Sequence, residues 1–119
     1  MAQSVSLSGR RRFRKLRVRS RVSGTASRPR LSVFPSWRSF SIQAIDDVSE
    51  KTIASASLRE VSEKDRHNTT EGAREVGKLL SKKCLALGIS AGVFDRNGYR
   101  YHGRVRAAAE GIREGGITV

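Results

Sequence analysis

The chain has 119 residues, which is enough for one domain with a modest hydrophobic core. Its 24 basic and 11 acidic residues give a net charge of +13, and its pI is about 11.4. So large an excess of cations favours a nucleic acid as partner over an anionic membrane surface. No apolar run approaches the roughly 18 residues of a membrane span, and the first residues lack the apolar core of a secretory signal.

The basic residues are concentrated at the start of the chain. Residues 1–30 hold ten basic and no acidic residues, whereas residues 31–119 hold 14 basic and 11 acidic ones. We expect residues 1–30 to form a basic arm, flexible when free and ordered on a polyanion, and residues 31–119 to form a single globular α/β domain. The densest part of the arm comprises Arg10, Arg11, Arg12, Arg14, Lys15, Arg17, Arg19 and Arg21. The competing interpretations are a solvated tail kept for solubility and an organelle transit peptide.

Three strands follow the arm. Alternating apolar and polar residues predict the first over Leu31–Phe34 and the second over Phe40–Ala44. The third is expected over Thr52–Leu58, where small side chains would let a helix lie close to the sheet. Short polar turns at residues 35–39 and 46–50 join these strands, which favours an antiparallel meander.

An amphipathic helix is expected next. Asn68 followed by Glu71 is typical of a capping box, and Gly88 predicts the end of the helix. Steps of three and four residues predict one buried face, made of Ala73, Val76, Gly77, Leu80, Cys84 and Leu87. We expect Cys84 to be buried and inert. As the chain's one cysteine it also excludes an internal disulfide, which is consistent with a reducing compartment.

A fourth strand and a last helix complete the expected fold. The strand is predicted over Ile89–Asp95, and because a helical crossover precedes it, it can pair in parallel with an earlier strand. The last helix is predicted from one apolar face and ends at Gly115-Gly116; the residues of that face are Val105, Ala108, Ala109 and Ile112. The apolar tail Ile117–Val119 is expected to dock back. The expected class is therefore α/β with a mixed (α+β) sheet.

The loop from Arg96 to Arg104 gives the main functional signal. It interleaves three arginines, two tyrosines and a histidine after a turn at Asn97-Gly98: Arg96, Tyr99, Arg100, Tyr101, His102, Gly103 and Arg104. Guanidinium groups fork onto phosphates and aromatic rings stack on bases, so this composition favours RNA. If the loop is extended, the two tyrosines point the same way. The competing interpretation is that one or both pack on the core.

The tip of the first hairpin is a second candidate. Trp37 beside Arg38 is able to stack on a base, and it fits equally well as a core ring that covers the end of the sheet. His67 and His102 lack neighbouring cysteines, so no zinc site is expected, and His102 is better interpreted as a phosphate or ribose contact.

Catalysis is the main alternative to binding. Asp46, Asp47 and Asp95 lie near strand ends, where clustered carboxylates would be able to hold Mg²⁺ for RNA hydrolysis. However, paired aspartates are ordinary in hairpin turns, and Asp95 stands beside a possible ion-pair partner, Arg96. The sequence shows neither a phosphate-cradling glycine loop nor a nucleophilic triad. A DNA-compacting basic protein is a weaker alternative, because no recognition-helix motif is present.

Five segments together carry a resemblance to a known family: Phe94–Val105, Arg28–Phe34, Gln43–Asp47, Ala54–Ser57 and Glu114–Gly116. From about Arg10 to its end, the chain resembles the family of bacterial large-subunit ribosomal protein eighteen. It departs at Pro35-Ser36-Trp37-Arg38, where the family usually has a basic residue and then polar residues.

The resemblance implies a structural protein of the large ribosomal subunit, without catalysis or cofactor. It implies binding to 5S rRNA, attachment of that RNA to 23S rRNA in the central protuberance, and proximity to large-subunit ribosomal protein five. It implies a ribosome in the cytoplasm, with an organelle ribosome as the alternative. The RNA contacts it implies are the arm cations named above, Arg28, Arg30, Ser36, Trp37, Arg38, Ser39 and the loop Arg96–Arg104.

Overall fold

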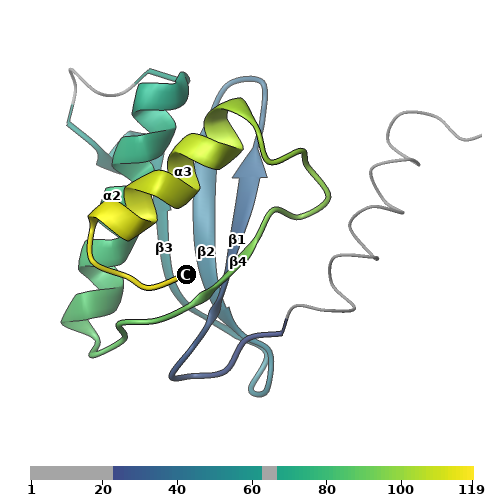
Figure 1. The fold of residues 1–119 in the computed structure, drawn as a ribbon, viewed down its shortest axis with the longest axis vertical. Coiled ribbons are helices and arrows are strands. Elements are labelled where there is room, and N and C mark those ends of the chain that lie inside the picture. Colours follow the sequence, from purple (N-terminus) through teal and green to yellow (C-terminus); the bar gives the residue numbers. More distant parts are fainter. Residues whose placement is uncertain (1–22, 63–66) are drawn as a thin grey trace, which may run out of the picture.

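The computed structural model describes residues 23–62 and 67–119, so the cations expected between residues 10 and 21 lie outside the described residues. Two helices cover one face of a four-stranded sheet (Figure 1). The elements are β1 (Arg30–Pro35), β2 (Phe40–Asp46), β3 (Lys51–Ser57), the short 3₁₀ helix η1 (Leu58–Glu60), α2 (Thr70–Ala86), β4 (Val93–Asp95) and α3 (Gly103–Glu114). This arrangement confirms the expected mixed α/β fold.

The sheet has the strand order β3-β2-β1-β4. The first three strands pair as the expected antiparallel meander, with Leu31 of β1 opposite Ala44 of β2. β4 joins the other edge of β1 in parallel, with Phe94 opposite Leu31. The parallel pairing follows from the crossover through α2, which returns the chain to the end of the sheet where β1 begins.

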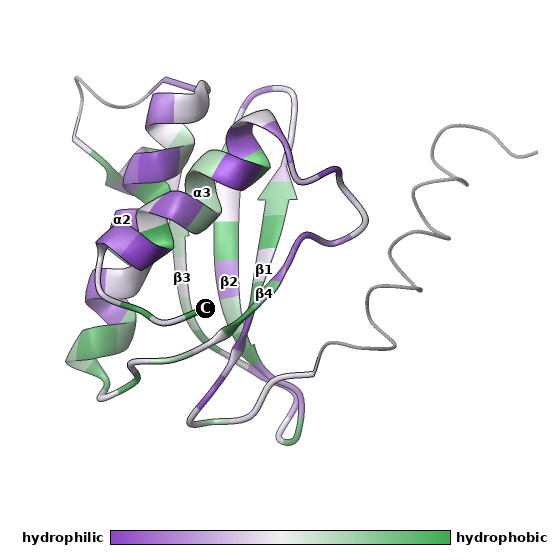
Figure 2. Ribbon diagram, in the orientation of Figure 1, coloured by the Kyte–Doolittle hydropathy of each residue, from purple (hydrophilic) through white to green (hydrophobic). Residues whose placement is uncertain are grey.

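The core lies between the sheet and the two helices. Period-two alternation places every second residue of the central strands under the helices, and these residues are fully buried: Leu31, Val33, Phe40, Ile42 and Ala44. The helices contribute Ala73, Val76, Leu80, Cys84, Val105, Ala108 and Ile112. Figure 2 shows hydrophobic stretches along the central strands, while the loop between β4 and α3 is hydrophilic.

Two glycines let α2 and α3 pack backbone to backbone. A Cβ atom on Gly77 would lie 2.4 Å from the carbonyl oxygen of Ala108, and one on Gly111 would lie 2.1 Å from that of Arg74. No side chain fits at either position. The Ser81 hydroxyl also crosses between the helices and donates to the Ile112 carbonyl at 2.7 Å. This contact and the two glycines hold α3 against α2, and the loop from β4 leads into the start of the helix held in this way.

Four boundary predictions are wrong in detail. The N-cap of α2 is Thr69, whose hydroxyl accepts from the Gly72 amide at 3.3 Å, and not Asn68. Leu87 is 56 % exposed because it follows the last turn of α2, where the chain reverses at Gly88 with φ of 80°. The third strand ends one residue early because Leu58 enters η1, and β4 is shorter than expected.

The C-terminal tail docks as expected. Ile117 is buried, and Thr118 forms a parallel bridge with Ala91 next to β4. The Thr118 amide donates to the Ser90 carbonyl at 3.0 Å, and the Gly92 amide donates to the Thr118 carbonyl at 2.9 Å. The tail therefore holds the segment that leads into β4 and the loop beyond it.

Candidate nucleic-acid interface

The loop between β4 and α3 is fixed at its base by Asn97. This residue is buried and has φ of 55°, and Gly98 after it has φ of 80°, so the two form the tight turn that their types favour. The Asn97 amide donates to Asp95 Oδ1 at 2.8 Å, and its side chain donates to the Val33 carbonyl at 3.2 Å. The loop thus starts from a rigid base on β1.

Arg104 joins the loop to the tip of the β1–β2 hairpin. Its Nη1 donates to the carbonyls of Ser36 and Ser39, at 2.9 and 3.3 Å. It also donates to Asn68 Oδ1 at 2.6 Å, and its guanidinium lies 5.8 Å from the centre of the Phe40 ring. One side chain therefore connects the start of α3, the start of α2 and the hairpin tip.

Asn68 completes this connection. Its Nδ2 donates to the carbonyls of Ser36 and Trp37, at 3.1 and 3.0 Å. Within the tip, the Ser36 hydroxyl donates to the Ser39 carbonyl and accepts from the Ser39 amide, both at 3.1 Å. Both serines thus use polar groups to close the turn. No local pattern indicates this role of Asn68, because its partners lie more than 30 residues earlier in the chain.

A cleft of about 220 Å³ lies where the loop meets the hairpin. Its lining comes from both segments: Pro35, Tyr99, Arg100, His102, Arg104 and Val105. His102 is exposed and is the N-cap residue of α3, but its side chain makes no capping hydrogen bond. Gly103 follows with φ of 56°, which suits a glycine at this turn into the helix.

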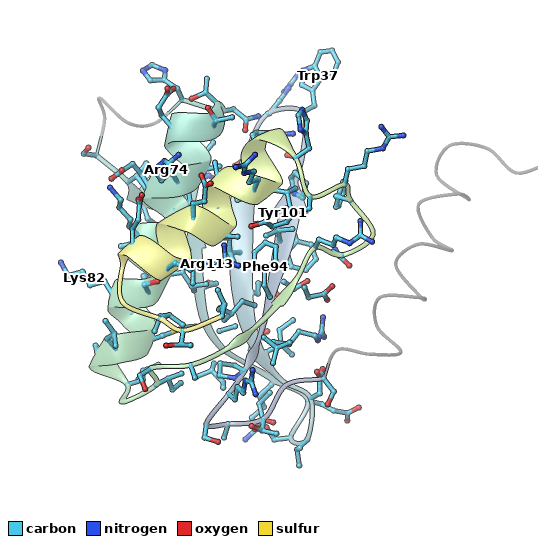
Figure 3. The ribbon with its side chains drawn as sticks, viewed as in Figure 1. Trp37, Arg74, Lys82, Phe94, Tyr101 and Arg113 are labelled. Atoms are coloured by element: carbon cyan, nitrogen blue, oxygen red, sulfur yellow. The ribbon has the colours of Figure 1, made fainter. Side chains whose placement is uncertain are left out.

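The two tyrosines contact different parts of the protein. Tyr99 is half-buried against the core and its hydroxyl donates to the Pro35 carbonyl at 3.5 Å. Tyr101 meets Phe94 edge to face, with ring centres 6.1 Å apart, and its hydroxyl accepts from Arg113 at 3.2 Å (Figure 3). Tyr99 is therefore mainly a packing residue, whereas Tyr101 remains 43 % exposed.

Trp37 lies at the tip of the hairpin and is 91 % exposed. Figure 3 shows its ring pointing away from the body of the protein. The interpretation of Trp37 as a core ring covering the sheet is wrong, because the turn closed by Ser36 and Ser39 directs it outward.

The arginines of the described segments divide into two groups. One group donates to protein acceptors: Arg30, Arg74, Arg96, Arg104, Arg106 and Arg113. In the other group, which comprises Arg28, Arg38, Arg59 and Arg100, each residue is exposed and forms no ion pair within residues 23–62 and 67–119. The second group is available to a partner without breaking the fold.

Arg30 belongs to the interior. Its guanidinium pairs in a bidentate fashion with Asp47, at 2.9 and 3.0 Å, and with the fully buried Asp95 at 2.7 Å. Burial alone would lower the pKa of Arg30, but hydrogen bonds and charge from the two carboxylates outweigh this and raise it. We therefore leave Arg30 out of the candidate interface.

The carboxylates considered for a metal site have other roles. Asp47 and Asp95 hold Arg30, so the neighbour Arg96 is not the ion-pair partner of Asp95. Asp46 closes the β2–β3 hairpin, where hydrogen bonds from the Ser49 hydroxyl and the amides of Val48 and Ser49 keep its pKa below the usual value. In the part of the chain that the structure describes, no three His, Cys, Asp or Glu residues are grouped so as to hold a metal ion.

Two further titratable groups support the fold. A hydrogen bond from Lys83 lowers the pKa of Glu60, which also accepts from the Ser57 amide at 2.9 Å. Burial raises the pKa of the Cys84 thiol, consistent with the expected buried, inert cysteine.

No helix of the described segments has the length and apolar character needed to cross a membrane.

Fold and surface together define a small basic α/β protein that displays guanidinium groups and aromatic rings beside one end of its sheet. Residues 6–119 match the family model described as "Ribosomal L18 of archaea, bacteria, mitoch. and chloroplast", and the chain belongs to this family. Members of the family are structural proteins of the large ribosomal subunit, not enzymes, and their partners are rRNA and other ribosomal proteins.

Individual relatives agree with the family match, and each is named large ribosomal subunit protein uL18. The chain is 53 % identical to that of Chloroherpeton thalassium over 110 residues, and this match covers 91 % of this chain and 92 % of the relative. It is 50 % identical over 103 residues to that of Bacteroides thetaiotaomicron, covering 87 % and 89 %. It is 44 % identical over 117 residues to that of Exiguobacterium sibiricum, covering 98 % of both.

Proposed function

We propose that this protein binds 5S rRNA and helps attach it to 23S rRNA in the central protuberance, next to large-subunit ribosomal protein five. The observation that carries this proposal is the direct contact between the hairpin tip and the loop before α3, two segments that are far apart in sequence. Arg104 and Asn68 hold the hairpin tip against the loop, so Trp37, Arg38, Arg100 and His102 belong to one rigid surface. A surface with exposed cations and rings suits folded RNA better than a regular duplex.

In this proposal the arm contributes charge and the domain contributes shape. The eight cations between residues 10 and 21 run along neighbouring phosphates, while the loop and hairpin tip contact irregular nucleotides. Among the loop residues, Arg100, Tyr101 and His102 are exposed and are proposed to contact RNA directly. Arg104, Asn97 and the two tip serines position them.

The test is binding to a 5S rRNA transcript at several salt concentrations. If the arm neutralises about six phosphates, log K should fall with log salt with a slope of about −4 to −5. A variant that lacks residues 1–21 should bind more weakly and with a flatter slope. The far-UV circular dichroism should be retained, because the described core contains none of those residues.

A random DNA duplex of equal length and a Mg²⁺ titration with labelled RNA are the controls. Equal affinity for the duplex and the transcript would overturn the proposal in favour of general DNA compaction. Shortening of the RNA would favour a nuclease.

A further inference from the structure

A second cleft adjoins the hairpin tip. It has a volume of about 360 Å³ and lies between the hairpin, η1 and the start of α2. The residues that line it are Arg38, Ser39, Leu58, Arg59 and Asn68. Of these, Arg59 and Asn68 were not expected to take part in binding, and neither has a local motif that would indicate it.

The cleft carries positive charge that no ion pair among the described residues compensates. Arg38 and Arg59 are exposed, and neither is ion-paired among residues 23–62 and 67–119. Glu60, the acidic neighbour of Arg59, is already paired with Lys83. Two guanidinium groups beside one cleft favour an anion with several oxygens, such as a phosphodiester.

Trp37 lies beside this cleft, and its backbone is held in place by hydrogen bonds. The carbonyl of Trp37 accepts from Asn68, which also lines the cleft, and the turn around Trp37 is closed by Ser36 and Ser39. A large ring held 91 % exposed on a rigid turn contributes nothing to the core of the protein. Because the backbone is already ordered, a contact through this ring loses little conformational entropy on binding.

We infer that the hairpin tip is a site for one unpaired nucleotide of 5S rRNA, an inference that rests on the proposed function. The Trp37 ring stacks on the base, and Arg38 and Arg59 bind the adjoining phosphates. Bases within a duplex are already stacked on their neighbours, so an exposed indole requires a nucleotide from a loop or bulge. The two guanidinium groups favour RNA over an apolar protein surface.

Intrinsic fluorescence gives a direct test, because Trp37 is the only tryptophan in the chain. Adding the 5S rRNA transcript to the full-length protein should quench its emission and protect the ring from acrylamide. Chemical probing of the RNA should show at least one unpaired nucleotide that the wild-type protein protects and the variant Trp37→Ala leaves reactive.

Affinity measurements separate stacking from general contact. Trp37→Ala should weaken binding roughly 5- to 150-fold, the range for loss of one base–aromatic stack, and Trp37→Phe should restore most of it. Arg59→Ala should also weaken binding and reduce the salt slope by about 0.7 to 0.9. Val48→Ala is the matched control, since Val48 is 79 % exposed at the opposite hairpin and should leave affinity unchanged.

The outcomes distinguish this inference from the proposed function. If the transcript binds but leaves Trp37 emission and acrylamide access unchanged, the nucleotide site is overturned while 5S rRNA binding stands, and Trp37 becomes a candidate protein contact. If Trp37→Ala and Trp37→Phe weaken binding equally, the ring is not stacked on a base. If the wild-type protein does not bind the transcript, both proposals fail.

Discussion

The two ends of β1 use arginine in opposite ways. At its start, Arg30 is 6 % exposed and is paired with Asp47 and Asp95. Beyond its end, Arg38 is exposed and outside the ion pairs of the described residues. The first cation holds strands together, and the second faces outward from a turn closed by other groups.

The difference lies in partners that are remote in sequence. Asp95 follows Arg30 by 65 residues and reaches it only because β4 pairs in parallel with β1. Among residues 23–62 and 67–119, no carboxylate forms an ion pair with Arg38 at the hairpin tip; the backbone carbonyls of the tip instead accept hydrogen bonds from Asn68 and Arg104. A basic residue in a basic sequence is therefore structural or functional according to what the topology brings beside it.

The largest expected effect is a loss of stability on substitution of Arg30, the buried arginine of this comparison. Arg30→Met should destabilise the protein by about 3–5 kcal/mol, because it leaves the carboxylate of Asp95 buried without its partner. Urea unfolding followed by circular dichroism measures the change. For molecules that remain folded, affinity for the 5S rRNA transcript should stay within about twofold of the wild type, because Arg30 does not reach the surface.

A second substitution identifies the cause of that loss. Arg30→Met combined with Asp95→Asn should recover part of the stability, since most of the penalty comes from the unpaired charge. Arg28→Ala, two residues away and exposed, should change stability by no more than about 0.5 kcal/mol. Equal effects of Arg28→Ala and Arg30→Met would contradict the assignment of Arg30 to the interior.

An intermediate effect on stability is expected at Arg104, whose side chain is partly buried and also lines the cleft of the candidate interface. Arg104→Ala should cost about 1.5–3 kcal/mol of stability, because it removes a charged donor from three oxygen acceptors. It should also weaken RNA binding by more than the loss of one charge predicts, since the hairpin tip is released from the loop. Unfolding curves and filter binding measure the two changes.

Arg104→Lys is the matched control. It keeps the charge but replaces the planar guanidinium with a single ammonium group. If the role of Arg104 is to position the tip, lysine should recover little affinity. Full recovery would show that only its charge matters to the RNA.

The order of elements follows from local patterns, and so it was predictable. Two patterns in the sequence show which residues are buried, because each repeats over only a few neighbouring residues. They are the strict alternation over Phe40–Ala44 and the apolar face at Val76, Leu80 and Cys84. Boundaries were less predictable where two adjacent residues were both able to cap, as at Asn68 and Thr69. Thr69 became the cap because the side chain of Asn68 is bound to the hairpin tip.

The candidate site was predictable in composition but not in arrangement. The mixture of arginine and aromatic residues marked the loop and the tip, yet it did not distinguish Tyr99, which packs against the core, from Tyr101, which is exposed. It also grouped Arg30 with the contacts. Each distinction depends on a tertiary partner, namely Pro35, Phe94 or Asp95, that no local pattern reveals.

The smallest stability effect, and the sharpest test of the outward-facing end, is expected at Arg100. Its side chain is exposed, lines the cleft between loop and hairpin, and forms no ion pair within the described ranges. Arg100→Ala should therefore leave the free energy of unfolding within about 0.5 kcal/mol of the wild type. If Arg100 contacts one phosphate, the salt slope for 5S rRNA should become shallower by about 0.7 to 0.9.

Arg106→Ala is the matched comparison, because Arg106 is also exposed but is paired with Glu110, and it should leave the slope unchanged. Equal slopes for the two variants would mean that availability of a guanidinium in the free protein does not decide which arginines meet the RNA.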